Sequence, residues 1–233
     1  DVVMALKEGA IRAGIPYRIF GGLRFYDRKE VKDVVAYLRC IVNPSDDVSL
    51  RRIINQPKRA IGESTIQELV RCATEREIPL YSVLMDLPEA LSARPRKCVR
   101  EFGDLMNELV MQQEEMSLTD FVKHLIAKTG LRAQYENDLS DEAKNRLENM
   151  DEFLGAVTEF EQASDEPTLS NYLENVALIT DLDSAETVAQ HVTLMTVHTA
   201  KGLEFPTVFV SGLEEGIFPS SRSIQDDNRL EEE

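Results

Sequence analysis

The chain has 233 residues, of which 42 % are hydrophobic and 29 % charged, so it can bury at least one sizeable core. This composition excludes a disordered tail, and no run approaches the roughly 18 uninterrupted apolar residues that a membrane helix needs. The formal net charge of −16 argues at first against nucleic-acid binding, because phosphates repel an acidic surface. Screening limits each charge to about 8–10 Å at physiological salt, however, so the local charge decides.

The charge is distributed unevenly along the chain. Residues 51–59 contain four basic and no acidic side chains, and residues 94–100 contain another four basic side chains. Acidic residues collect in residues 136–166 and in the last twenty residues. This pattern suggests local cationic surfaces on an otherwise acidic protein.

The cysteines and histidines are dispersed. Cys40, Cys72 and Cys98 lack pairing or metal-ligand spacing and each lies in a helical pattern, which predicts reduced core thiols and a cytoplasmic protein. The three histidines are too scattered to suggest a metal site. The N-terminus is too short and charged for a secretory signal, and the chain looks like a segment of a longer protein.

The N-terminal part predicts a helix, a strand and a second helix. The first helix is expected over residues 3–13 and the strand over residues 15–20, each ended by glycine. Asp27, with a glutamate three residues later, resembles a capping box. Apolar residues at helical spacing then continue until the proline at position 44.

Helix follows helix through the middle of the chain, without a convincing alternating strand pattern. A short helix around residues 50–54 ends before Pro57, and residues 64–67 read as a capping box that begins the next helix. Further helices are expected at residues 79–86, 98–113, 118–129, 141–162 and 168–178.

The pattern becomes β-type near the C-terminal end. Residues 192–197 and residues 207–210 are rich in β-branched and aromatic side chains. A parallel sheet covered on both faces needs more strands than these, so the α/β part is incomplete. The simplest architecture is a mainly α domain inserted into a partial α/β domain.

The most specific motif is LMTVHTAKGLEFP at residues 194–206. It brings hydroxyl, imidazole and lysine groups to the C-terminal end of a strand, where open α/β sheets bind ligands and where such groups suit phosphate contacts. From these residues alone, an ordinary β–α junction with a hydrogen-bonded His198 is the alternative.

This motif resembles motif V of superfamily 1A helicases, the UvrD, Rep and PcrA group, with the PcrA branch nearest. Four further segments match the group in the same order and extend the resemblance over nearly the whole chain. They are GIPY with GGLRFYDRKEVKD (residues 14–33), IINQPKRAIG (53–62), NRLENMDE (145–152) and EEGIFP (214–219). The resemblance implies an ATP-driven motor that moves 3′ to 5′ along single-stranded DNA and displaces the other strand.

The implied fold is a helical 2B-type domain inserted into a partial RecA-like domain, 2A. Residues 1–24 and 191–233 would belong to 2A, and residues 25–190 to 2B. The implied partners are duplex DNA, a single-stranded 3′ tail and the rest of the helicase (domains 1A and 1B and the remainder of 2A), with repair or transcription proteins in addition and no membrane. Glycines 21–22 and the polar loop near residues 181–187 are the expected hinges.

The resemblance also implies roles for individual residues near motif V. Glu204 would contact the nucleotide sugar and Gly202 would allow close packing at the nucleotide cleft. Thr196 and His198 match positions near the single-stranded DNA backbone, with Lys201 a weaker candidate that could be an ordinary solvated lysine. No catalytic residue is implied within this segment.

Residues 57–65 resemble a helix-hairpin-helix DNA-binding element. A tight turn before a helix exposes N–H groups that favour anions, and such contacts hold phosphates without reading sequence. The expected duplex ligands are Lys58, Arg59, Ile61, Gly62, Ser64 and Thr65. Relatives read Gly-Ile-Gly, so Ala60 would cost about 1–2 kcal/mol if its position requires positive φ. A basic turn without a DNA role is the alternative.

The ATPase machinery is incomplete in this sequence. It contains neither a phosphate loop nor the acidic magnesium motif, and it stops at Glu231-Glu232-Glu233, where relatives continue into the arginine-bearing motif VI. ATP and Mg²⁺ are therefore expected in the full-length protein and not on this segment. The isolated chain is predicted not to hydrolyse ATP.

Two other interpretations remain open. The 2B part could be mainly a protein-docking or autoinhibitory module, because an acidic surface and amphipathic helices suit that role as well. Charge reversal at Lys58 and Arg59 would discriminate between the two. The related helicase–nuclease subunits of the RecB and AddA type have more divergent inserted domains, and nothing in this sequence resembles a nuclease.

Overall fold

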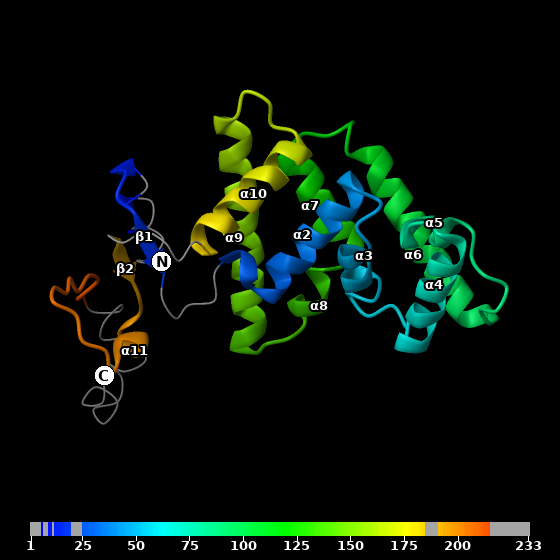
Figure 1. Cartoon of the computed structure of the whole chain (residues 1–233), viewed down its shortest axis with the longest axis horizontal. Coiled ribbons are helices and arrows are strands. Elements are labelled where there is room, and N and C mark those ends of the chain that lie inside the picture. Colours follow the sequence, from blue (N-terminus) through cyan, green and yellow to red (C-terminus); the bar gives the residue numbers. More distant parts are fainter. Residues whose placement is uncertain (1–5, 7–8, 11, 20–24, 185–190, 215–233) are drawn as a thin grey trace. The chain divides into compact units, whose positions relative to one another are not determined.

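The computed structural model describes residues 6, 9–10, 12–19, 25–184 and 191–214. The chain divides into two compact units (Figure 1). The helical unit is continuous and contains residues 24–182, and the terminal unit combines residues 1–23 with residues 183–233. The helical unit is therefore inserted between two segments of the terminal unit. The expectation of a mainly helical chain is confirmed.

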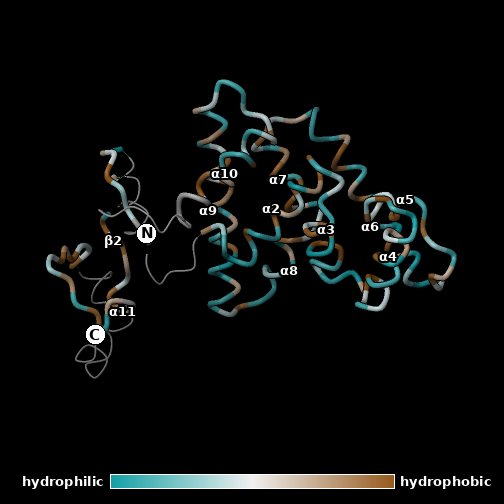
Figure 2. Tube along the Cα trace, in the orientation of Figure 1, coloured by the Kyte–Doolittle hydropathy of each residue, from teal (hydrophilic) through white to brown (hydrophobic). Residues whose placement is uncertain are grey.

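The helical unit contains a 3₁₀ turn followed by nine α-helices in its described residues. These are η1 (Phe25–Asp27), α2 (Lys29–Val42), α3 (Asp47–Ile53), α4 (Glu63–Arg76), α5 (Leu80–Met85), α6 (Ala93–Gln112), α7 (Leu118–Thr129), α8 (Ala133–Glu136), α9 (Asp141–Ala163) and α10 (Leu169–Ser184). Helix α2 packs against α3, α6 and α9, whereas α5 packs between α4 and α6. Hydrophobic and hydrophilic residues are interspersed along these helices, as expected for amphipathic helices that bury one face (Figure 2).

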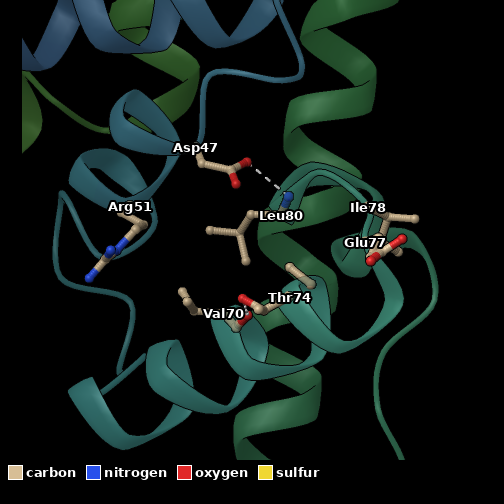
Figure 3. Close-up of a pocket in the computed structure, with 8 residues that line it drawn as sticks. Asp47, Arg51, Val70, Thr74, Glu77, Ile78 and Leu80 are labelled. Carbon is tan, nitrogen blue, oxygen red and sulfur yellow. Dashed lines mark hydrogen bonds between the residues drawn. The ribbon is translucent and has the colours of Figure 1, made fainter.

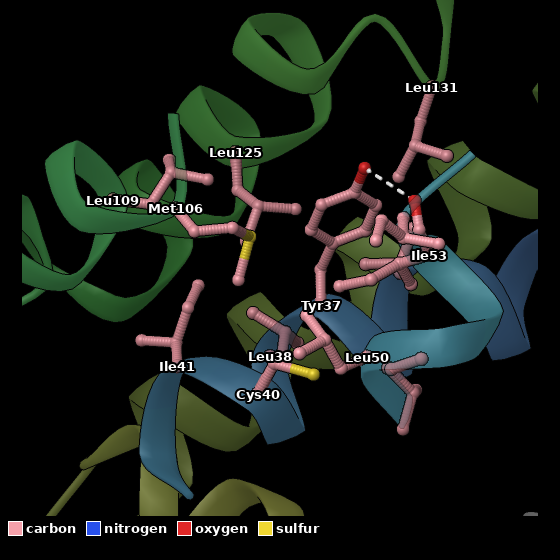
Figure 4. Packing of buried hydrophobic residues seen from close by; sticks show 14 of the residues in the cluster. Tyr37, Leu38, Cys40, Ile41, Leu50, Ile53, Met106, Leu109, Leu125 and Leu131 are labelled. Carbon is pink, nitrogen blue, oxygen red and sulfur yellow. Dashed lines mark hydrogen bonds between the residues drawn. The ribbon is translucent and has the colours of Figure 1, made fainter. Parts of the chain in front are cut away.

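Helix α2 lies at the centre of the core. Its apolar residues point in nearly every direction, and Val31, Val34 and Leu38 are fully buried. Tyr37 of the same helix is surrounded by side chains from α3, α6 and α7 (Figure 4). Each such side chain contributes about 1.5–3 kcal/mol relative to exposure, so this helix organises the unit.

Parts of two segments matched by sequence, residues 25–33 and residues 145–152, meet in the helical unit. Arg28 donates a hydrogen bond to the Glu152 carboxylate at 3.0 Å, and Asn149 donates to the buried carboxylate of Glu30. These contacts tie the beginning of α2 to the middle of α9. Residues far apart in the sequence thus form one polar contact region.

The two predicted capping boxes do not form. Helix α2 follows Arg28 without a side-chain cap, because the Asp27 carboxylate forms an ion pair with Lys32 at 2.7 Å instead. Helix α4 follows Gly62, so Ser64 lies inside its first turn rather than at its cap. Both helices therefore begin without the side-chain cap that the sequence predicted.

The ends of two other helices can be compared with the sequence prediction, which is right for α7 and wrong for the start of α6. The predicted ends of α7 are confirmed: the Ser117 hydroxyl accepts the Asp120 N–H at 3.3 Å, and Gly130 ends the helix at φ +79°. Helix α6 begins at Ala93 rather than at residue 98, because Pro95 lies in the first turn, where a missing N–H costs nothing. The pattern missed the short α8.

The terminal unit contains a two-stranded parallel sheet in its described residues. Strand β1 (Tyr17–Ile19) pairs with β2 (Val192–Leu194), with Tyr17 opposite Val192. The short helix α11 (Val197–Ala200) follows β2. The predicted strand over residues 192–197 was therefore too long.

The predicted strand at residues 207–210 is wrong. This segment has no strand structure, and Val208, Phe209 and Val210 are 64 %, 92 % and 55 % exposed. A strand requires a neighbour to accept and donate its backbone hydrogen bonds, and no neighbouring strand reaches this segment among the described residues.

Several predicted features lie partly or wholly outside the described residues. Residues 6, 9, 10 and 12 of the first expected helix are helical, and the other residues of that helix before residue 12 are not described. Glycines 21–22, residues 185–187 and most of the EEGIFP motif are also outside. Residues 181–184 continue α10 and do not form the expected loop. No helix in the described part is long and apolar enough to cross a membrane.

Candidate nucleic-acid interface

The bend at residues 54–62 joins α3 to α4. The side chains of Ile53 just before it, Ile54 at its start and Ile61 near its end are fully buried. These isoleucines pin both ends of the bend to the core of the helical unit. The residues between them are thereby held at the surface.

The bend is braced from inside by two polar side chains. The Asn55 side-chain carbonyl accepts the N–H groups of Arg59 at 2.8 Å and Ile61 at 3.3 Å. The Tyr37 hydroxyl donates to the Gln56 carbonyl at 2.7 Å. Burial raises the pKa of Tyr37 far above its ordinary value, so this hydroxyl keeps its proton and its donor role.

Arg59 is directed into the protein. One terminal nitrogen donates to the Pro57 carbonyl at 3.0 Å, and the other donates to the Thr129 carbonyl at 2.9 Å. The guanidinium also lies 5.3 Å from the ring centre of Phe102 and 5.9 Å from that of Tyr37. Arg59 thus connects the bend to the C-terminal end of α7, where a cation is favoured.

Ala60 adopts the left-handed conformation, with φ +58°. The side chain is exposed, so no packing contact compensates for the clash between its Cβ and the backbone. The position that is glycine in the resembled motif therefore does require positive φ here. Alanine costs about 1–2 kcal/mol at such a position.

The outer surface of the bend presents a lysine and backbone donors. Lys58 is exposed and forms no ion pair with any described residue. The N–H groups of Gly62, Glu63 and Ser64 have no acceptor in the described part of the chain, because the first helical bonds run from the N–H groups of Thr65 and Ile66 to the Gly62 carbonyl. The positive end of the α4 dipole adds to these donors, although the Glu63 carboxylate opposes it.

The predicted duplex ligands fall into two groups. Lys58, Gly62 and Ser64 are exposed together around the bend, whereas the side chains of Ile61 and Thr65 are buried and Arg59 points inward. Sequence reasoning missed the bracing residues Asn55 and Tyr37. Asn55 lies within the matched motif and could have been found from its amide side chain, but Tyr37 is on another helix and gave no local signal.

The second predicted site follows strand β2 in the terminal unit. Thr196, Lys201 and Glu204 are exposed at the C-terminal end of this strand, and the Thr196 carbonyl accepts the Ala200 N–H at 3.0 Å. The backbone turns at a glycine with φ +82°, Gly202, a conformation that glycine adopts without a steric penalty. His198 lies on α11, and its side chain is outside the described part.

These residues fit only part of a nucleotide. The Glu204 carboxylate can accept hydrogen bonds from sugar hydroxyls, and the Gly202 turn allows close approach. The described residues contain no group of three or more acidic, histidine or cysteine side chains arranged for a metal ion.

A separate open cavity of about 270 Å³ lies between α3, α4 and the start of α5 (Figure 3). Val70, Ile78 and Leu80 give it an apolar lining, and the Asp47 carboxylate at its edge accepts the Leu80 N–H at 2.9 Å. Arg51 contributes a cation to the lining. None of the residues predicted to bind DNA or nucleotide lines this cavity.

Comparison with known proteins gives a consistent match over the chain. The UvrD-like helicase C-terminal domain family matches residues 3–233. The chain is 39 % identical to the ATP-dependent DNA helicase PcrA of Bacillus subtilis over 235 residues, which cover 98 % of this chain and 32 % of that protein. It is 40 % identical to the Staphylococcus epidermidis protein of the same name and 39 % identical to that of Staphylococcus aureus, with the same coverage.

The family match extends over described residues of both the helical and the terminal unit. The chain spans about a third of the length of the curated relatives it matches. Their names support the resemblance found from motif V and the four other segments. The chain belongs to the UvrD-like helicase C-terminal domain family.

Proposed function

We propose that this chain is the part of an ATP-dependent DNA helicase that holds duplex DNA through the bend at residues 54–62 and the N-terminal end of α4. In this proposal the helical unit is domain 2B and the terminal unit is part of domain 2A of a motor that moves 3′ to 5′. The names of the PcrA relatives and the family match support the helicase assignment.

One observation carries the duplex-binding proposal. A hydrogen-bonded bend presents an exposed lysine, which forms no ion pair with a described residue, beside three N–H groups that also lack a described acceptor, at the end of a helix whose dipole favours anions. Backbone N–H groups and lysine bind phosphates without distinguishing bases. That is the property a motor requires when it must move over any sequence.

The terminal unit would contribute one side of the nucleotide and single-stranded DNA sites. Glu204 would contact the sugar beside the turn at Gly202, and Thr196, His198 and Lys201 would lie along the single strand. ATP supplies the free energy for translocation when bound, and the phosphate loop, the Mg²⁺ ligands and the motif VI arginine would come from the remainder of the protein.

Charge reversal at the bend tests the duplex-binding proposal in the full-length protein. Lys58→Glu should weaken binding to a short blunt fluorescein-labelled duplex. It should also make the slope of log K against log salt concentration shallower by about 0.9 for each phosphate that the protein no longer neutralises. Lys144→Glu, on the exposed start of α9, is the matched control and should leave duplex binding unchanged. Equal binding by both variants would contradict the proposal.

A second candidate function is protein docking, which the cavity between α3, α4 and α5 favours. Its apolar lining and its charged residues Asp47, Arg51 and Glu77 suit a short peptide with an apolar side chain beside a charged one. Under this alternative, Lys58→Glu would leave duplex affinity unchanged, and substitutions in the cavity would reduce partner binding. Both measurements can be made on the same protein.

A further inference from the structure

We propose that Arg59 and Asn55 act on duplex DNA indirectly, as positioning residues that hold the bend, while Lys58 and the N–H groups of residues 62–64 contact phosphate. This inference rests on the proposed duplex-binding function. It separates two adjacent basic residues that the sequence pattern treats alike. Their different roles follow from where their side chains point.

The Arg59 guanidinium is already satisfied by the protein itself. Its two terminal nitrogens donate to the carbonyls of Pro57 and Thr129, with a longer contact of 3.4 Å to the Ile53 carbonyl. The rings of Phe102 and Tyr37 lie against it. A phosphate ligand would have to break these contacts, so Arg59 is a poor direct ligand in this arrangement.

The contacts of Arg59 also reach far along the chain. Thr129 is the last residue of α7, and Phe102 lies in the middle of α6. Arg59 therefore ties the bend between α3 and α4 to two helices that follow later in the chain. A phosphate-binding turn requires its N–H groups to converge. Because contacts with α6 and α7 already hold the bend, less conformational entropy is lost when it binds phosphate.

Asn55 holds the bend from within. A single side-chain oxygen accepts the N–H groups of Arg59 and Ile61, the residues on either side of Ala60. This pair of bonds stabilises the loop in which Ala60 has positive φ. The three N–H groups that follow, at Gly62, Glu63 and Ser64, have no acceptor among the described residues and can bind a ligand.

The decisive variants are Arg59→Lys and Arg59→Gln in the full-length protein, with Lys58→Gln as the contact variant. Lysine keeps the charge but lacks the planar guanidinium group, whose several N–H donors reach different carbonyls at once. Both Arg59 variants should therefore weaken binding to the short labelled duplex by a similar factor, about tenfold. Amide hydrogen exchange over residues 54–66 should be faster in both Arg59 variants and unchanged in Lys58→Gln.

A direct phosphate role for Arg59 predicts a different pattern. In that case Arg59→Lys would bind duplex as the wild type does, while Arg59→Gln would be impaired, and this result would overturn the inference. Wild-type binding by both folded Arg59 variants would overturn it as well. Wild-type binding by Lys58→Gln would instead count against the proposed contact surface, so failure of the proposed function is distinguishable.

Asn55→Ala provides a second route if the Arg59 variants do not fold. It removes the acceptor for two N–H groups without changing charge, so it should weaken duplex binding and speed exchange over residues 54–66. Asn55→Asp keeps an acceptor oxygen and should preserve the slow exchange. Equal exchange in Asn55→Ala and the wild type would contradict the positioning role of Asn55.

Discussion

Ala60→Gly is expected to stabilise the helical unit. Ala60 is held at φ +58°, where the Cβ of alanine clashes with the backbone at a cost of about 1–2 kcal/mol. Glycine removes this cost but loses about 0.4–1 kcal/mol through the greater freedom of the unfolded chain. Because the Ala60 side chain is exposed, no packing is lost, and the net gain should be about 0.5–1 kcal/mol.

Urea and thermal unfolding of the 233-residue chain, followed by far-ultraviolet circular dichroism, would measure this gain. In a domain of this size, a gain of that order raises the melting temperature by about 1–4 °C. The matched control is Ala177→Gly in α10, where alanine is also exposed but helical. That substitution should lower stability by about 1 kcal/mol.

The two substitutions are chemically identical, so only the backbone conformation distinguishes them. If Ala60→Gly destabilised the chain as much as Ala177→Gly does, residue 60 could not have the left-handed conformation. The bend would then carry no strain at this position. A gain at Ala60 with a loss at Ala177 would support the strained conformation.

Three further substitutions test the contacts that hold the helical unit, each by urea unfolding. Tyr37→Phe removes the donor to the Gln56 carbonyl and should cost about 1–2 kcal/mol; an unchanged midpoint would argue that this bond is absent. Ile61→Ala empties a fully buried site and should cost about 2–4 kcal/mol, whereas a cost typical of surface residues would contradict its burial. Hydrogen bonds from Thr119, together with the Leu118 N–H, lower the pKa of Glu161. A carboxylate whose pKa is lower in the folded than in the unfolded protein stabilises the fold at pH values above its unfolded pKa of about 4.3. This stabilisation is lost as the pH falls through the folded pKa. Glu161→Gln should therefore be less stable than wild type at neutral pH, and this difference should shrink as the pH falls through the folded pKa of Glu161. A difference independent of pH would refute the assignment.

Local sequence was sufficient for much of the helical unit because amphipathic spacing and helix-end residues act over a few positions. The helix ended by Gly130 illustrates this, since glycine supplies a positive φ that few other residues tolerate. Two of the predictions that failed show where a local pattern is not sufficient. Ser64 has a side chain suited to a cap but lies inside the first turn of α4, and residues 207–210 carry strand propensity without a neighbouring strand to pair with in the described part of the chain.

The amino-acid sequence by itself determined the mainly helical class, the family resemblance and the position of the basic bend, because these depend on residue type and spacing. The tertiary structure alone decided what each residue of the bend does. Lys58 and Arg59 are neighbours with the same charge, yet one is exposed and the other is bonded to Thr129, seventy positions later in the chain. The direction of such a side chain depends on which distant carbonyls and rings the fold brings within reach, and no local pattern encodes that.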